Sequence, residues 1–156
     1  DAAVNSQVGG CLKTIGDAIL GCFDSKYHYR FWRPRTAIPA AGADGNAATS
    51  PEDGWQPLLP TPNHPEYPSG HSCIAGALAE VVKESFGTPQ VSFEWSSNAN
   101  AGTRAYDSVY EMIREIRNAR VHGGMHYRFS SDDGITLGRR TARWVLDNYF
   151  RPVARR

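Results

Sequence analysis

The stretch PSGHSCIAGALAEVVKESFG, residues 68–87, contains the clearest helix signal of the chain. Ser69 is a suitable N-cap residue, and the run Gly87-Thr88-Pro89 supplies a stop signal. Between them, apolar side chains recur at three- and four-residue steps, which is the helical period; they are Ile74, Leu78, Val81, Val82 and Phe86. The stretch therefore predicts a helix that opens at Pro68-Ser69-Gly70-His71 and ends at Phe86.

Three other regions repeat the helical period. The region from Val4 to about Arg33 predicts one or two helices, on a pattern formed by Val8, Leu12, Ile15, Ile19, Leu20 and Phe23. The region 103–121 predicts a helix with one side formed by Tyr106, Val109, Tyr110, Ile113 and Ile116. The region from Ile135 to about Phe150 predicts a last helix that directs inward Leu137, Thr141, Trp144, Val145 and Tyr149. The short segment 91–95 suits a strand or a loop, so the predicted fold class is all-α, a helical bundle.

A long loop separates the first helical region from the second. Residues 34–68 hold eight of the ten prolines and show no sustained periodicity. Pro34 disfavours helix at the residue before it, so we expect Arg33 at a helix terminus or on the following turn. Trp55 and Tyr67 predict that parts of this loop pack against the helices, and long loops in compact domains are usually functional or disordered.

Length and composition describe a globular chain. Its 156 residues predict a single helical domain, 1–156, with 40% hydrophobic and 21% charged residues. The formal net charge of +1 gives no bulk field that would recruit nucleic acid or an anionic membrane. No signal peptide or membrane-spanning segment is apparent, and the compartment stays open. Because the chain opens with Asp1 rather than Met, we expect a processed or truncated piece.

The three cysteines do not form a recognisable framework. Cys11, Cys22 and Cys73 are too few and too scattered for a set of disulfides or for a zinc site with close ligand pairs. If Cys11 and Cys22 share one helix, they lie about 16 Å apart, which is beyond the reach of a disulfide.

A first candidate constellation is the basic segment 26–34. On a helix, Lys26 and Arg33 are seven positions apart and would present two cations to one side. No acid lies between Lys26 and Arg35 to neutralise them. A solvated basic face is the alternative interpretation.

A second constellation is the helix start at Ser69, Gly70 and His71. Exposed backbone N–H groups and the positive end of the helix dipole make such a place a ready anion site. His71 would exchange a proton with the bound group. An ordinary capped helix with an exposed histidine is the alternative.

A third constellation is Arg120-Val-His122-Gly-Gly-Met-His126. The paired glycines allow a sharp turn after the helix, which would bring His126 beside Arg120. A buried, hydrogen-bonded histidine is the alternative, and zinc at His122 and His126 lacks an obvious third ligand. Together the three constellations supply fixed cations, a helix N-terminus and two histidines, which suits a tetrahedral oxyanion such as phosphate or vanadate.

These motifs resemble a known superfamily. The patterns K-x6-R-P at 26–34, P-S-G-H at 68–71 and R-x5-H at 120–126 have the order and spacing found in vanadium-dependent haloperoxidases and type 2 phosphatidic acid phosphatases. The resemblance spans roughly residues 20 to 135. It implies a helical bundle of the haloperoxidase and acid phosphatase type, with the long Pro- and Gly-rich loop between the first and second motifs.

The resemblance also implies roles for the motif residues. The oxygens of vanadate or phosphate would be held by Lys26, Arg33, Ser69, Gly70 and Arg120. The axial residue would be His126, which bonds vanadium in a haloperoxidase and attacks phosphorus in a phosphatase. His71 would be the acid–base residue.

Neighbouring residues favour the haloperoxidase branch. The run His126-Tyr127-Arg128-Phe129 resembles the haloperoxidase form, and His64 stands where bromide-oxidising members carry a second active-site histidine. Phosphatases usually carry Asp four residues after the axial histidine, where this chain has Ser130, so Asp132 or Asp133 would have to substitute. The resemblance thus implies bromide oxidation with hydrogen peroxide at a His-bound vanadate.

Two alternatives remain. One is a soluble acid phosphatase that acts on phosphomonoesters through a phosphohistidine, and the other is a non-catalytic proteolytic fragment. Family haloperoxidases are much longer, so we expect a C-terminal piece whose exposed faces are covered by the missing N-terminal segment or by a homo-oligomer.

Overall fold

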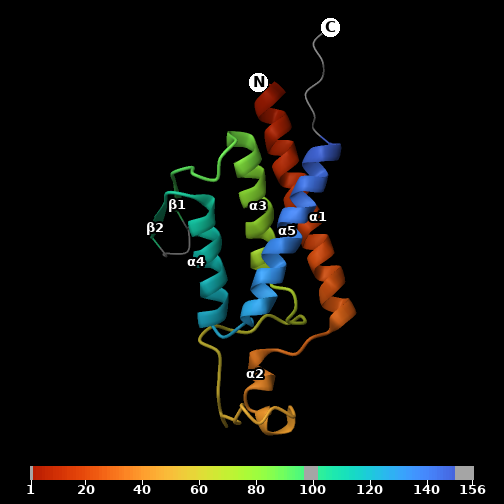
Figure 1. Cartoon of the computed structure of the whole chain (residues 1–156), viewed down its shortest axis with the longest axis vertical. Helices are drawn as coiled ribbons and strands as arrows, with labels where there is room; N and C mark the ends of the chain where they lie inside the picture. Colours follow the sequence, from red (N-terminus) through yellow and green to blue (C-terminus); the bar gives the residue numbers. More distant parts are fainter. Residues whose placement is uncertain (1, 97–101, 150–156) are drawn as a thin grey trace.

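The described part of the chain is built mainly from four long helices, whose arrangement Figure 1 shows. The computed structural model describes residues 2–96 and 102–149. The long helices are α1 (Ala2–Tyr29), α3 (Gly70–Phe86), α4 (Val109–His122) and α5 (Arg128–Asn148). The shorter elements are α2 (Pro34–Ala37), the 3-10 turn η1 (Ala41–Ala43) and an antiparallel hairpin of β1 (Phe93–Ser96) and β2 (Thr103–Tyr106). The helical-bundle prediction is confirmed, with a small hairpin added.

Helix α3 is the centre of the bundle and begins and ends as predicted. It packs against α1, α4 and α5, and Gly87 ends it in the left-handed conformation at φ 69°. Glycines allow α3 and α5 to approach backbone to backbone: a Cβ on Gly134 would lie 2.7 Å from the Ser69 carbonyl oxygen. On its other side, α3 packs against α4 through an apolar cluster formed by Ala75, Ala79, Val109, Met112 and Ile113.

The apolar residues whose spacing predicted α1 do not form the buried face of that helix. Leu12 is 66% exposed and Leu20 is 70% exposed. The buried positions recur every fourth residue and carry Thr14, Ala18, Cys22 and Lys26. Small side chains let α1 come close to its neighbours, so the larger apolar side chains point away from them.

Helix α5 shows the same reversal in part, although Val145 is buried as predicted. It begins at Arg128 rather than near residue 135, and Trp144 is 55% exposed although the pattern predicted it inward. Tyr149, also predicted inward, is exposed as well. The buried positions of α5 are Ser130, Ser131, Gly134, Gly138, Ala142 and Val145. Close packing against α3 again selects the small residues.

The predicted helix over 103–121 is two elements. Residues 103–106 form β2, which pairs with β1, so the segment 91–95 contributes a strand. Helix α4 starts only after Ser108, whose side-chain oxygen accepts a hydrogen bond from the Glu111 backbone N–H at 3.2 Å. This N-cap fixes the start of the helix.

The loop between α1 and α3 packs as its aromatics predicted. Trp55 and Tyr67 are both half-buried, and a Cβ on Gly124 would lie 2.9 Å from the Trp55 ring. Helix α1 ends at Tyr29, and Arg33 lies in extended backbone before α2. The expectation that Lys26 and Arg33 share one helix face is therefore wrong, because the chain turns between them.

A buried carboxylate ties α3 to α5. Glu80 on α3 accepts hydrogen bonds from Arg143 at 2.7 Å, from Arg139 at 3.0 Å and from Lys83 at 3.0 Å. Burial alone would raise the pKa of Glu80, but these three donors lower it to about 2. No helix in the described part of the chain is both long and apolar enough to cross a lipid bilayer.

Candidate oxyanion site

The candidate site lies at the end of the bundle where α1 and α4 finish and α3 and α5 begin (Figure 1). The positive N-terminal ends of α3 and α5 favour an anion there. Lys26 lies in the last turn of α1 and Arg120 in the last turn of α4. The basic side chains offset the negative C-terminal ends of α1 and α4 and act in the same direction as the positive ends of α3 and α5.

A pocket of about 200 Å³ opens at this end of the bundle. Its walls are formed by Ile19, Cys22, Phe23, Pro62, His64, Gly70, His71, Ile74, Arg120 and His126. Five of the predicted site residues are thus in the wall itself. The other three, Lys26, Arg33 and Ser69, are buried in the surrounding structure.

Lys26 has no exposed surface. Its ammonium donates to the carbonyl oxygens of Pro65 at 3.1 Å and Glu66 at 2.9 Å, so it joins α1 to the loop that precedes α3. Burial, together with repulsion by Arg33, lowers the pKa of Lys26 to about 8. The lysine is charged at neutral pH and lies 4.0 Å, at its Cε, from where a Cβ on Gly70 would stand.

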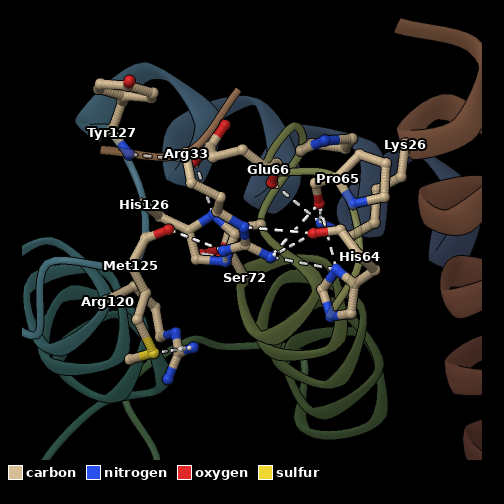
Figure 2. A network of polar contacts seen from close by, with 12 residues as sticks. Lys26, Arg33, His64, Pro65, Glu66, Ser72, Arg120, Met125, His126 and Tyr127 are labelled. Carbon is tan, nitrogen blue, oxygen red and sulfur yellow. Dashed lines mark hydrogen bonds and ion pairs between the residues drawn. The ribbon is translucent and has the colours of Figure 1, made fainter. Parts of the chain in front are cut away.

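Arg33 lies between two histidines, as Figure 2 shows. One guanidinium nitrogen donates to the Met125 carbonyl oxygen at 2.7 Å and lies 3.3 Å from Nε2 of His126. The other donates to the His64 carbonyl oxygen at 3.0 Å and lies 3.1 Å from Nδ1 of His64. Arg33 therefore connects the loop before α3 to the turn before α5.

The contacts of His126 fix which ring nitrogen carries the proton. Nδ1 lies 2.7 Å from Oε1 of Glu66, and a carboxylate can only accept. Arg33 can only donate, so Nε2 has no proton and directs its lone pair toward the guanidinium. Burial lowers the pKa of His126 to about 4, against the opposing effect of Glu66. The neutral ring with a free Nε2 is the form that bonds a metal or attacks phosphorus.

Glu66 is a buried residue of the candidate site that the sequence analysis missed. It has no exposed surface, and its Oε1 also accepts from the Tyr127 backbone N–H at 3.1 Å. Neither Asp132 nor Asp133 substitutes as the orienting acid, because Asp132 pairs with Arg117 at 2.9 Å and Asp133 accepts from the Tyr67 hydroxyl. In the sequence, Glu66 is the single acid between Asp53 and Glu80. This isolated acid, close before the 68–71 motif, is the signal from which it could have been identified.

The double-glycine turn brings Arg120 and His126 together. The Arg120 carbonyl oxygen accepts from the backbone N–H groups of Met125 at 3.2 Å and His126 at 3.3 Å. One Arg120 guanidinium nitrogen lies 3.1 Å from the Met125 sulfur, and its buried Nε has no partner among the described residues. Burial and the neighbouring Arg33 both lower the pKa of Arg120.

The three residues at the start of α3 differ from one another in their surroundings; they are Ser69, Gly70 and His71. The Ser69 backbone N–H donates to the Ser130 carbonyl oxygen at 3.0 Å, and its hydroxyl oxygen accepts from Ser72 at 3.1 Å. Gly70 begins α3, where backbone N–H groups have no partner within the helix. His71 has exposed surface but also lines the pocket, and the loss of water around the ring on that side, followed by repulsion from Arg120, lowers its pKa.

The donor set fits a tetrahedral oxyanion. Two buried cations, Lys26 and Arg33, and the half-buried Arg120 share this end of the bundle with one buried carboxylate, Glu66, and buried charge is stable only when it is paired. An oxyanion with several negative charges would balance them and satisfy the free donors of Arg120. The Nε2 lone pair of His126 completes the set.

The pKa of Lys26 predicts how anion binding depends on pH. Sulfate stays fully ionised across the range, so its affinity reports the protein alone. Below about pH 8 Lys26 is protonated, so affinity is expected to be high there and to fall as the pH rises past 8. Titration calorimetry with sulfate from about pH 6 to about pH 10 measures this. A flat profile would contradict the placement of Lys26 beside the anion.

Comparisons with known proteins agree with this geometry. A family model described as the VCPO second helical-bundle domain matches residues 11–155. A crystal structure of the first bacterial vanadium-dependent iodoperoxidase is similar over 88% of this chain and 32% of its own, at 31% identity and a TM-score of 0.77. No curated protein sequence matches the chain.

Two further structures share the fold. They are the apo and holo forms of a bacterial vanadium-dependent chloroperoxidase, both 18% identical, with TM-scores of 0.75 and 0.70. They match over 91% and 88% of this chain and over 35% and 34% of their own. The chain thus spans about a third of the length of these structures. It belongs to the VCPO second helical-bundle domain family, among the vanadium-dependent haloperoxidases.

Proposed function

We propose that the pocket binds vanadate and supports the oxidation of halide, with bromide favoured, by hydrogen peroxide. The observation that carries the proposal is the unprotonated Nε2 of His126, which lies at the pocket wall beside the Arg33 guanidinium while Glu66 holds the proton on Nδ1. The chain spans about a third of the length of the related structures. The activity of a whole haloperoxidase is therefore proposed for this chain and does not follow from the similarity alone. The relatives are peroxidases named for iodide and chloride.

The residues present would hold vanadate in a defined way. Nε2 of His126 would be the protein ligand to the metal, and the cations Lys26, Arg33 and Arg120 would hold the oxygens. Ser69 and the Gly70 backbone N–H would add hydrogen bonds from the start of α3. When bound, vanadate supplies a Lewis acid that activates peroxide without changing its own oxidation state.

The two remaining histidines would act on protons and on the halide. His71 at the rim would exchange a proton with peroxide, since its lowered pKa keeps it neutral and able to accept. His64 lines the pocket beside Arg33, where it would face an incoming halide. Bromide is favoured because His64 stands where bromide-oxidising members of the superfamily carry a second active-site histidine.

A second candidate function is phosphomonoester hydrolysis in the same pocket. The observation that favours it is the Glu66–His126 pair at 2.7 Å, because a buried carboxylate orients the ring and stabilises positive charge on it. His126 Nε2 would attack phosphorus and displace the alcohol, and water would then hydrolyse the phosphohistidine. His71 would protonate the leaving alcohol.

A paired assay separates the two functions. The chain is incubated with and without orthovanadate and tested for bromide oxidation by peroxide, and separately for p-nitrophenyl phosphate hydrolysis near about pH 5. We expect bromide oxidation that depends on added vanadate. Hydrolysis that vanadate inhibits would establish the phosphatase instead.

If neither bromide oxidation nor phosphate-ester hydrolysis is detected, the proposal that this chain is catalytic is wrong. Sulfate titration would then distinguish a pocket that still binds oxyanions from one that does not. Binding without turnover would support the non-catalytic fragment. Turnover restored by adding the part of a related enzyme that this chain does not match would show that this part completes the site.

A further inference from the structure

A second pocket, of about 430 Å³, lies along the later part of α3. Helix α3 contributes Leu78, Val82 and Phe86 to the wall of this apolar pocket. These residues follow Gly70 of the oxyanion pocket by 8 to 16 positions, which corresponds to about 12–24 Å along the helix axis. Figure 1 shows the β1–β2 hairpin, which also borders the apolar pocket, beside the start of α4 at the other end of the bundle. The proposed oxyanion chemistry therefore makes no use of this pocket.

The apolar pocket is built on the packed core. Val109 and Met112 of α4 line it and are both buried. The segment between α3 and β1 contributes Val91 and Ser92. This segment is tied to α4, because the Val109 backbone N–H donates to the Pro89 carbonyl oxygen at 3.1 Å. A pocket held in place in this way is preformed, which limits the entropy that is lost when a ligand binds.

Three aromatic side chains line the apolar pocket. Phe86 and Trp95 are exposed, and Phe93 is half-buried against Tyr106, with the ring centroids 5.3 Å apart. Phe93 and Tyr106 are also partners in the register of the hairpin, which fixes this part of β1. Aromatic rings contact other rings favourably, and the flexible side chain of Met112 suits the same partners. The wall therefore favours a ligand that contains rings.

The wall of the apolar pocket offers almost no polar group. Among the described residues that line it, none is charged, and the one hydroxyl, that of Ser92, donates to Asp107 at 3.3 Å. The cation that follows Val82 on α3 is Lys83, which pairs with Glu80 and with Glu84, each at 3.0 Å. A carboxylate or a phosphate in this pocket would lose its water without gaining a partner. The wall therefore selects against charged ligands.

We propose that the apolar pocket binds an uncharged aromatic molecule of two or three rings. A protein cavity of about 150 Å³ accepts one benzene ring, so a volume of about 430 Å³ has room for two or three rings. The inference goes beyond the proposed function and does not depend on it, because the pocket is separate from the one that holds the oxyanion.

Titration with two matched probes tests the inference. N-phenyl-1-naphthylamine is neutral, has three rings and fluoresces strongly only in apolar surroundings, and 1-anilinonaphthalene-8-sulfonate adds one sulfonate to the same ring skeleton. Both are titrated into the chain in excess sulfate, which occupies the oxyanion pocket. We expect saturable binding of the neutral probe, one molecule per chain, and an affinity for the sulfonate that is lower by at least about 10-fold.

Variants locate the bound probe. Val82→Phe fills part of the apolar pocket and Trp95→Ala removes one ring from its wall, so each should weaken binding of the neutral probe about 10-fold. Trp144→Ala is the matched control, because Trp144 is 55% exposed, against 50% for Trp95, but lies on α5 and does not line the pocket. Its affinity should be unchanged. Circular dichroism checks that each variant is folded.

Four outcomes would overturn the inference. They are no saturable binding by the wild-type chain, equal affinity for the two probes, an equal loss in Trp95→Ala and Trp144→Ala, and a concentration-dependent dimer that excludes the neutral probe. The last outcome would mean that a second copy of the chain covers the pocket. The comparison of the two probes on the wild-type chain decides the question even if Val82→Phe fails to fold.

Discussion

His126→Ala is expected to abolish turnover in either assay, by at least about 10³-fold, while the helical bundle stays folded. The substitution removes the unprotonated Nε2 that Glu66 orients through its contact with Nδ1. It also leaves Glu66 buried without its partner at 2.7 Å. Activity is measured by bromide oxidation with vanadate and by p-nitrophenyl phosphate hydrolysis, and folding by circular dichroism.

Two further variants are needed to interpret this result: a control histidine and the acid that contacts His126. His122→Ala removes a histidine four residues earlier that is exposed at the end of α4 and does not line the pocket, so activity should be retained. Glu66→Gln keeps an acceptor for Nδ1 but removes the charge, and should lower kcat about 10- to 100-fold. Unchanged turnover in His126→Ala would refute the axial assignment. Equal losses in His122→Ala would point to a general effect on the fold.

Gly138→Ala is expected to destabilise the fold by about 2 kcal/mol or more, which is large against a typical total of about 5–15 kcal/mol. The added Cβ would overlap the Cys73 carbonyl oxygen and would lie 2.7 Å from the Ala77 backbone nitrogen. Both are backbone atoms of α3, so neither can turn aside as a side chain would. Thermal unfolding should show a midpoint lower by about 5 °C or more.

Gly16→Ala is the matched control for this substitution. Gly16 is also in the middle of a helix, but it is exposed, and a Cβ there would meet nothing within 4 Å. Alanine should therefore stabilise α1 by about 0.5–1 kcal/mol, because it restricts the unfolded chain more than glycine does. If both variants changed stability by the same amount, the close contact of α3 and α5 would not be the cause.

The sequence predicted the helix over 70–86 well because its start and stop signals are local. Ser69 at the N-cap position and Gly87 at the end act within one turn of chain. The Gly123–Gly124 turn is local in the same sense, and it does bring the backbone of Arg120 and His126 together. Patterns that act over a few residues do not depend on what packs around them.

The faces of α1 and α5 were not predictable in the same way. Large apolar residues such as Leu20 and Trp144 follow the helical period but stay exposed, while Ala18 and Gly138 are buried. The buried side is decided by how closely two helices can approach, and small residues permit the closest approach. Periodicity alone counts apolar residues and gives small ones little weight.

By itself, the sequence determined a helical bundle and the identity of the motif residues, because helix signals and motif spacing are properties of neighbouring positions. Only the tertiary structure decided that Glu66 pairs with His126 and that Arg33 contacts His126 from outside α1. These partners are separated by 60 and 93 residues. Contacts of that kind exist only after the helices have packed, since packing sets the distances that govern hydrogen bonds and charge.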